Sequence, residues 1–279
     1  MTPESFALLA GLVKARAGIV LAADKTYLLE TRLAPLLRRE GIASLDALAC
    51  RLRDPRLAEA LAREVVEALT TNESSFLRDG KPFEHLRGAL PRLAAGRPPG
   101  RPLRIWSAAC STGQEAYSVA MILAESVGPG GSALRAEILG TDINREVLAR
   151  AREGSFTQFE VQRGLPARLL VKFFKPEADG NRWRIAPELR AMAKFEEANL
   201  LGDLGRFGRF DVIFCRNVLI YFDAPTKARV LDALARQLAP DGLLYLGGAE
   251  TVLGLTDRLA AVAGERGIYG PAPAAVPVG

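Results

Sequence analysis

The chain has 279 residues, of which 49% are hydrophobic and 25% are charged. These proportions are ordinary for a soluble globular protein, and the length is enough for one large or two small domains. No apolar run approaches the roughly 20 residues of a membrane span, and the first residues lack the basic start of a signal peptide. We therefore expect a cytoplasmic protein.

Cysteine and histidine are scarce, which limits the kinds of metal site and catalytic site that the chain can form. Cys50, Cys110 and Cys215 share no metal-ligand spacing, and His85 is the only histidine. Composition therefore argues against a metal site and against a histidine-based catalytic triad. The net charge of +5 and the isoelectric point of about 9.3 permit an acidic partner such as nucleic acid, lipid or an acidic protein surface.

Residues 5–70 have the pattern of helices throughout. Apolar residues recur at helical spacing in three groups: Phe6, Leu8, Leu9, Leu12 and Val13; Leu28, Leu29, Leu33, Leu36 and Leu37; Leu57, Leu61, Val65 and Leu69. Pro35 predicts a kink or a break in the second group, and Ser44 is an expected N-cap. This pattern predicts a small helical domain.

Basic residues recur every seven positions in this domain, at Lys25, Arg32 and Arg39, with Arg38 beside them. On a helix they would share one face. Two interpretations remain open: a solvated surface, or a docking face for an acidic helical partner.

The rest of the chain is organised around residues 104–115. An apolar run leads into a turn of small residues, and an amphipathic pattern follows from Ala116. Strand, turn and helix in this order place backbone N–H groups and a helix N-terminus at the carboxyl end of a parallel strand, where α/β sheets bind ligands. Only Gly113 of the glycine-rich fingerprint is present, so an ordinary strand-to-helix turn is the alternative.

Two further predicted strands end in polar residues. Residues 137–142 end in Asp142, whose carboxylate can accept both hydrogen bonds of a ribose diol. The spacing between Gly113 and Asp142 is longer than is usual between such a glycine and the acidic residue. An intervening loop at residues 128–132 accounts for the excess. Residues 210–215 lead into Arg216 and Asn217. Polar residues at the ends of these strands predict a nucleoside site.

The remaining expected elements are a polar linker at residues 70–79, helices at 81–95, 144–153 and 226–238, a turn at 240–242, and strands at 243–247 and 267–270. Residues 155–194 have an irregular pattern, in which residues 183–185 have the character of an edge strand. The Ala/Pro-rich tail from Pro271 is expected to be disordered.

Three stretches together resemble the chemotaxis-receptor glutamate O-methyltransferases of the CheR type: residues 72–78, 106–118 and 214–222. They stand in the family's order, and the resemblance covers nearly the whole chain. It implies an α/β protein with a helical receptor-docking domain (1–70), a linker that contacts the cofactor (71–80) and a Rossmann-like methyltransferase domain (81–270). A small antiparallel β-subdomain (155–194) is inserted, and a disordered tail (271–279) follows.

The resemblance also implies the cofactor S-adenosylmethionine, the product S-adenosylhomocysteine and a set of site residues. The expected cofactor-binding residues are Asn72, Ser74, Arg78, Ala108, Glu115, Asp142, Asn199, Leu200, Arg216 and Asn217. Arg78 and Tyr221 are the candidates for positioning at the reacting centre. The implied partner is a chemoreceptor helix docked on Lys25, Arg32, Arg38 and Arg39, and the enzyme is expected to be a monomer.

The chain departs from the family at two places. Many relatives have His-Ser where this chain has Gly248 and Ala249. In some members a glycine-rich loop of the inserted subdomain grips a receptor C-terminal peptide, whereas the equivalent loop here, residues 175–182, has a single glycine. Peptide binding at this loop is therefore left open.

The chemistry implied is displacement of a methyl group by a carboxylate. A glutamate side chain, with a pKa near ~4.3, is ionised at neutral pH and needs no general base. One alternative is a nucleic-acid methyltransferase, but residues 216–219 lack the Asp/Asn-Pro-Pro-Tyr/Phe motif that cradles a target amine. A second is a non-catalytic S-adenosylmethionine-sensing scaffold, against which the presence of Glu115, Asp142 and Arg78 argues.

Overall fold

The computed structural model describes residues 1–126, 134–178 and 180–273, apart from the side chains of residues 55–58. The chain forms two compact units: Met1–Thr71 with Tyr221–Lys227, and Asn72–Ile220 with Ala228–Gly279. No helix in the described parts of the chain is both long and apolar enough to span a membrane.

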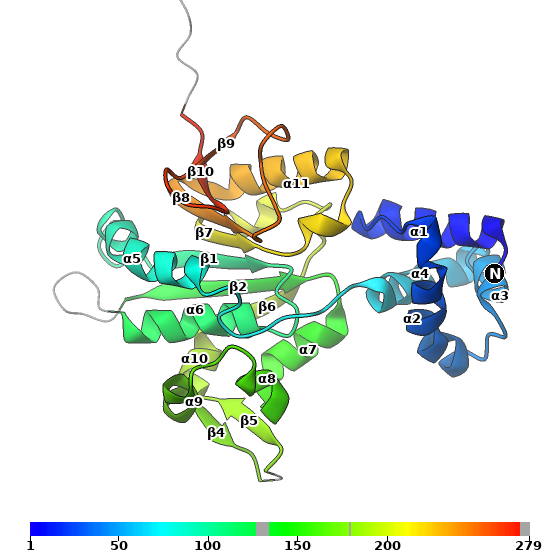
Figure 1. The fold of residues 1–279 in the computed structure, drawn as a ribbon, viewed down its shortest axis with the longest axis horizontal. Coiled ribbons are helices and arrows are strands. Elements are labelled where there is room, and N and C mark those ends of the chain that lie inside the picture. The colour runs from blue at the N-terminus through cyan, green and yellow to red at the C-terminus, as the bar shows by residue number, and fades with distance from the viewer. Residues whose placement is uncertain (127–133, 179, 274–279) are drawn as a thin grey trace, which may run out of the picture. The chain divides into compact units, whose positions relative to one another are not determined.

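The first unit is helical, as its sequence pattern predicts (Figure 1). Its elements are α1 (Pro3–Ala17), η1 (Ala23–Lys25), α2 (Thr26–Arg39), α3 (Leu45–Arg51) and α4 (Pro55–Leu69). The Ser44 hydroxyl accepts a hydrogen bond from Ala47 N at 3.1 Å, which confirms the expected N-cap of α3. The core is formed by fully buried residues of these helices, among them Leu9, Val13, Leu29, Leu33, Leu48 and Val65.

The expected interruption at Pro35 does not break the helix, because α2 is continuous from Thr26 to Arg39. Proline inside a helix costs about 3 kcal/mol. The same helix buries Leu29, Leu33 and Leu36 to between 0% and 4% exposure, and each such leucine contributes about 1.5–3 kcal/mol. Tertiary packing therefore outweighs the local cost of the proline.

The segment Tyr221–Lys227 belongs to the helical unit although it lies far along the chain. Val20 N donates to Tyr221 O at 2.9 Å, and Lys14 Nζ lies 2.8 Å from the Asp223 carboxylate. A Cβ atom at Gly18 would lie 3.2 Å from the Phe222 ring. The helical unit is thus completed by a loop from between two strands of the other unit.

Arg32, expected on a docking face, has a structural task in this unit. Its guanidinium donates to the carbonyls of Leu69 at 2.9 Å and Thr70 at 3.2 Å, and to Thr71 Oγ1 at 3.0 Å. These groups lie at the C-terminal end of α4, where helix carbonyls lack internal partners and a cation is favourable.

We predict that Arg32→Ala destabilises the helical unit by about 1.5–3 kcal/mol, the range for hydrogen bonds to a charged group. Urea denaturation of the full chain, followed by circular dichroism, should show an earlier loss of helix. Arg38→Ala is the matched control because Arg38 is an exposed arginine on the same helix. Equal denaturation curves for the two variants would contradict the capping role.

The second unit contains a mainly parallel sheet with strand order β6-β2-β1-β7-β8-β10-β9 among the described residues (Figure 1). Strands β6, β2, β1, β7 and β8 are parallel, and β10 runs antiparallel to β8 and β9. The strands are β1 (Leu103–Ala108), β2 (Ala136–Asp142), β6 (Ala193–Glu197), β7 (Phe210–Cys215), β8 (Leu238–Leu246), β9 (Leu259–Ala261) and β10 (Ile268–Pro271).

Helices surround this sheet and supply much of the hydrophobic core. The main helices are α5 (Lys81–Ala95), α6 (Gln114–Glu125), α7 (Arg145–Glu153) and α11 (Ala224–Gln237), with short η3 (Gly205–Phe207) and η4 (Leu219–Tyr221). α6 and α7 pack on strands β2 and β6. These helices match the predicted ones, and the predicted strands that end at Asp142 and Cys215 are present as β2 and β7. Because both strands are parallel to β1, their carboxyl ends lie at the same edge of the sheet.

The structure differs from expectation near the C-terminus. The expected turn at residues 240–242 lies inside β8, as an irregularity between the pairs Phe210–Leu238 and Val212–Leu243. Strand β9 was not predicted. Strand β10 includes Pro271, the first residue of the expected tail. The rest of that tail from residue 274, and the loop expected at residues 128–132, lie outside the described residues.

The inserted subdomain is a small antiparallel sheet of order β3-β5-β4, as the resemblance implied. It comprises β3 (Ser155–Thr157), β4 (Phe174–Pro176) and β5 (Arg182–Ile185) with helices α8 (Gln158–Gln162), α9 (Ala167–Phe173) and α10 (Pro187–Met192). Residues 183–185 do form a strand, but the prediction that it lies at an edge is wrong. They belong to β5, which is the central strand and pairs with β3 and β4. Its neighbours are only three residues long, too short to reveal a strand period.

Candidate active site

The turn after β1 explains the run of small residues in the sequence. Ala109, Ser111 and Gly113 all have left-handed backbone conformations, with φ of 58°, 52° and 92°. A Cβ atom at Gly113 would lie 3.0 Å from Ala151 Cβ and 3.2 Å from the Tyr117 ring. Glycine is therefore required there, and the turn leads the chain directly into the N-terminus of α6.

Asp142 joins this turn to the end of β2. Its carboxylate accepts hydrogen bonds from Ser111 N at 2.9 Å and from Asn144 N at 3.0 Å, and the residue is 7% exposed. Burial raises the pKa of Asp142, while the N–H donors of Asn144 and Ser111 act in the opposite direction. Each carboxylate oxygen has a second lone pair, so capacity for a ribose diol remains.

Arg216 is the most highly connected charged residue of the site. Its side chain is 2% exposed, and its Nη1 lies 3.2 Å from the Glu115 carboxylate. Its Nη2 donates to Asp79 at 2.6 Å and to the carbonyl of Arg78 at 2.9 Å. The guanidinium also lies over the ring of Phe83, 5.6 Å from its centroid. One side chain thus joins the end of β7, the start of α6 and the linker.

The linker, residues 72–80, forms a fixed strap along the carboxyl edge of the sheet. Ser111 Oγ donates to Asn72 O at 2.8 Å, and Leu77 N donates to Ser118 Oγ at 2.9 Å. Phe76 is fully buried, and its ring centroid lies 4.9 Å from that of Phe156 in the inserted subdomain. The strap is therefore held from both the main sheet and the subdomain.

A cleft lies between the strap and the strand ends. Its lining residues are Glu73, Ser74, Ser75, Arg78, Ala109, Cys110, Ser111, Glu115, Arg216 and Asn217. Of the predicted site residues, the cleft brings together Ser74, Arg78, Glu115, Arg216 and Asn217.

The other predicted residues lie outside that lining. Asn72 adjoins it through its bond with Ser111, and Ala108 immediately precedes the turn. Ala198 N donates to Asp142 O at 3.0 Å, which brings the segment carrying Asn199 and Leu200 to the end of β2. Tyr221 belongs to the helical unit, so its role at the reacting centre stays a prediction.

Two supporting residues were not predicted. Ser107 Oγ donates to Glu115 at 2.8 Å, and Asp79 pairs with Arg216. Ser107 is a polar residue within an otherwise apolar strand, a sequence signal that could have suggested a buried hydrogen bond. The position of Asp79 carries no such signal, because its partner lies 137 residues away.

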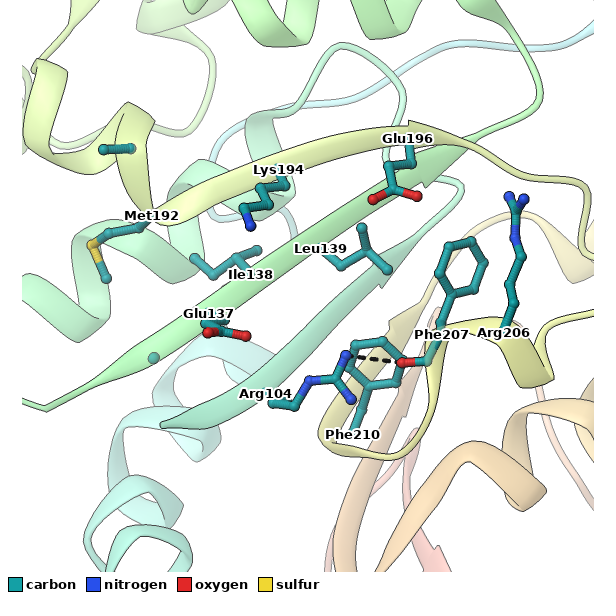
Figure 2. Close-up of a pocket in the computed structure, with 12 residues that line it drawn as sticks. Arg104, Glu137, Ile138, Leu139, Met192, Lys194, Glu196, Arg206, Phe207 and Phe210 are labelled. Atoms are coloured by element: carbon teal, nitrogen blue, oxygen red, sulfur yellow. Dashed lines mark hydrogen bonds between the residues drawn. The ribbon is translucent and has the colours of Figure 1, made fainter. Parts of the chain in front are cut away.

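A larger cavity of about 530 Å³ lies elsewhere on the sheet (Figure 2). Figure 2 shows Lys194 and Glu196 of β6 beside Leu139 of β2, with Phe207 and Phe210 on the opposite side. This cavity lies against the amino-terminal half of β2, whereas open α/β sheets bind ligands at the carboxyl ends of their strands. We therefore assign the candidate active site to the smaller cleft.

These features define a Rossmann-like domain that binds a nucleoside cofactor. Comparison with known families gives the same class: residues 72–268 match "CheR methyltransferase, SAM binding domain", and residues 4–70 match "CheR methyltransferase, all-alpha domain". The chain belongs to the CheR methyltransferase family, and it is an S-adenosylmethionine-dependent methyltransferase.

Named relatives match along almost their whole length. The Chemotaxis protein methyltransferase Cher2 of Pseudomonas putida is 39% identical over 254 residues, which cover 90% of this chain and 91% of that protein. The Chemotaxis protein methyltransferase of Vibrio parahaemolyticus is 38% identical over 263 residues, or 92% of each chain. That of Borreliella burgdorferi is 32% identical over 258 residues, or 91% of this chain and 90% of that protein.

The cleft has the chemistry that this cofactor requires. Asp142 offers acceptors at the end of β2 beside the cleft lining, and Glu115 offers a carboxylate in the lining whose side chain is 12% exposed. Arg216 Nε is a buried N–H donor that has no hydrogen-bond partner within the described residues. A buried unpaired donor is costly, and a bound polar ligand relieves that cost.

We predict that Asp142→Ala lowers the affinity for S-adenosylhomocysteine by about 1.5–3 kcal/mol, or roughly 10- to 150-fold. Because burial raises the pKa of Asp142, wild-type affinity should fall on acidification while the pH is still above ~3.9, the ordinary aspartate value. Titration calorimetry at several pH values measures both effects. The Asp142→Asn variant should lack this component of the pH dependence. Wild-type affinity in the Asp142→Ala variant would contradict the assignment.

Proposed function

We propose that the chain transfers the methyl group of S-adenosylmethionine to glutamate carboxylates of chemoreceptors and forms glutamate methyl esters. The supporting observation is the chemistry of the cleft lining. Among the described residues that line it, none is histidine or lysine, and its two carboxylates are engaged in ion pairs, Glu73 with Arg163 and Glu115 with Arg216. Burial raises the pKa of the Cys110 thiol well above its ordinary value, so the thiol is neutral. A carboxylate substrate needs no general base, whereas an amine substrate does.

The names of the relatives support the chemotaxis assignment, since all three are called chemotaxis protein methyltransferases. We accordingly place the protein in the cytoplasm, where the helical parts of chemoreceptors are modified, and expect it to act as a monomer.

Bound S-adenosylmethionine supplies an electrophilic methyl group on a sulfonium. In our proposal Asp142 accepts hydrogen bonds from the ribose, and the strap residues Asn72 and Ser74 close over the cofactor. Ala108, Asn199 and Leu200 complete its surroundings. Glu115 offers acceptor capacity to the cofactor's ammonium group, while Arg216 and Asn217 hold the edge of the cleft from β7.

Arg78 and Tyr221 are proposed to position the substrate. Arg78 is half-buried in the cleft lining, and its Nη1 donates to the carbonyl of Glu73 at 3.2 Å. This bond leaves other N–H groups of the guanidinium available. A planar guanidinium can orient a carboxylate while one carboxylate oxygen stays free to attack.

Arg78→Ala should lower turnover by about a hundredfold or more, since ~1 Å of misplacement is enough for such a loss. Affinity for S-adenosylhomocysteine should fall less, because the group acts on the carboxylate. Arg78→Lys should restore little, since an ammonium cannot hold a carboxylate in a planar fork. Steady-state kinetics with saturating cofactor measures turnover, and a lysine variant with nearly normal turnover would remove the positioning role.

The reaction itself is tested by transfer of labelled methyl from S-adenosylmethionine to receptor-containing membranes. The label should appear in receptor protein and be released as methanol by mild base, as expected of an ester. Base-stable label in protein would indicate another acceptor atom. Label in nucleic acid would support the nucleic-acid methyltransferase, although residues 216–219 lack that class's motif. Cofactor binding without any transfer would support a sensing scaffold.

The receptor is proposed to dock on the basic face of the helical unit. Lys25 lies 3.5 Å from Asp24, Arg39 pairs with Glu40 and Glu64, and Arg38 is exposed. Because Arg32 caps α4, reversing its charge would alter the stability of the helical unit as well as receptor docking. Arg38 is the cleaner probe.

Arg38→Glu should raise the Michaelis constant for receptor by roughly twofold to fivefold, the range of one exposed ion pair. Cofactor affinity should not change, and added salt should weaken wild-type receptor binding because exposed charges are screened beyond ~8–10 Å. Arg53→Glu, at another exposed arginine of the same unit, is the control. If both variants behave like wild type, the face is a solvated surface.

A further inference from the structure

Glu250 is a buried acid that takes no part in the proposed chemistry. It lies in the turn after β8 and is 8% exposed. One carboxylate oxygen accepts hydrogen bonds from Gly247 N at 2.6 Å and Asn217 N at 2.9 Å, and the other accepts from Ile220 N at 3.3 Å. Among the described residues, none of the ion pairs involves Glu250. A buried carboxylate in these surroundings is held by backbone N–H groups.

Two of these three donors lie in the loop that follows β7. Asn217 has a left-handed backbone with φ of 59°, a conformation that needs support from its surroundings. Glu250 bonds to the N–H of Asn217 itself and to that of Ile220, three residues further on. The carboxylate therefore fixes both ends of this short segment.

Gly247 limits the same loop from the opposite direction. A Cβ atom there would lie 2.9 Å from both Asn217 N and Asn217 Nδ2, and 2.7 Å from a Glu250 oxygen. These distances are too short for a real side chain, so the loop rests directly on the backbone of Gly247. Its position is set by close contact on one side and by the Glu250 bonds on the other.

The position of this loop governs the cleft because Arg216 precedes Asn217 and both residues line it. The Arg216 side chain has no freedom to compensate for a backbone shift. It is held by Glu115, by Asp79 and by the carbonyl of Arg78. A displacement of Asn217 would therefore be transmitted to the strap that carries Arg78.

We propose that Glu250 is a positioning residue for methyl transfer, which acts by holding the backbone of Asn217–Ile220 and thereby the Arg216 guanidinium and the strap. This inference rests on the proposed activity. It adds a residue that contacts neither the cofactor nor the receptor carboxylate.

Two substitutions test the proposal from opposite sides of the loop. Glu250→Ala removes all three acceptor contacts, whereas Gly247→Ala keeps the carboxylate group but pushes on both it and Asn217. Both should lower turnover by about tenfold or more at saturating cofactor and receptor, with Michaelis constants for receptor within about twofold of wild type. Glu250→Gln should have a smaller effect, because its amide oxygen can keep two contacts while its NH2 group faces Ile220 N–H.

Glu265→Gln is the control for loss of a carboxylate, since Glu265 is exposed in the turn between β9 and β10. Each preparation is normalised by the fraction that binds S-adenosylhomocysteine, so an unfolded fraction does not enter the comparison. If Glu250→Ala fails to fold, Glu250→Gln and Gly247→Ala still decide the question.

Hydrogen exchange provides a readout that does not depend on turnover. The amides of Asn217 and Ile220 should exchange faster in Glu250→Ala. In Glu250→Gln only the Ile220 amide should exchange faster, because the remaining oxygen still accepts from Asn217 N, and in Glu265→Gln both should exchange at the wild-type rate. Unchanged exchange at these amides would overturn the proposal, as would turnover within twofold of wild type in both Glu250→Gln and Gly247→Ala. Wild-type protein that transfers no methyl would instead count against the proposed function, and the exchange result would still decide the role of Glu250 in holding the loop.

Discussion

The site depends on one buried cation, the guanidinium of Arg216. Removing a charge from water is costly, and the interior must return that free energy through well-placed partners. Glu115 and Asp79 supply opposite charge, and the carbonyl of Arg78 supplies a further acceptor. These partners come from α6 and from the strap, so the requirement to satisfy Arg216 also fixes those two elements. The Nε–H has no partner in the described residues and stays available to a ligand.

The inserted subdomain contributes to this arrangement by supporting the strap. Phe76 packs against Phe156 and Phe174 with edge-on ring contacts, and Arg163 pairs with Glu73. At Gly164 a Cβ atom would lie 2.1 Å from the carbonyl of Phe76, so any other residue would push the strap away. The subdomain therefore supports the strap directly, whether or not its loop binds a receptor peptide.

Local sequence patterns were enough to predict the helical unit and the strand ends, because both depend on short-range regularities, whereas the inserted antiparallel sheet was implied only by the family resemblance. Buried parallel strands are continuous apolar runs, and the turn at Ala109–Gly113 needs small residues, so both leave a mark in the sequence. Arg32 shows the limit of this reasoning. Its heptad spacing suggested a surface for a partner, yet its hydrogen bonds go to the end of α4, some 37 residues away. The role of Glu250 was hidden in the same way, since its loop partners are 30 and 33 residues distant.

Two irregular segments contribute residues to the cleft, and both adjoin points where the chain passes between the two units. The chain passes between the two units at residues 71–72, 220–221 and 227–228. The strap begins at the first of these passages, and the loop held by Glu250 ends at the second. Neither segment has regular secondary structure throughout, so neither is fixed by its own backbone hydrogen bonds. Asn72, Leu77 and Asn217 are instead held by side chains of the main sheet unit: Ser111, Ser118 and Glu250. Precise placement of two irregular segments therefore requires polar side chains brought from elsewhere in the fold.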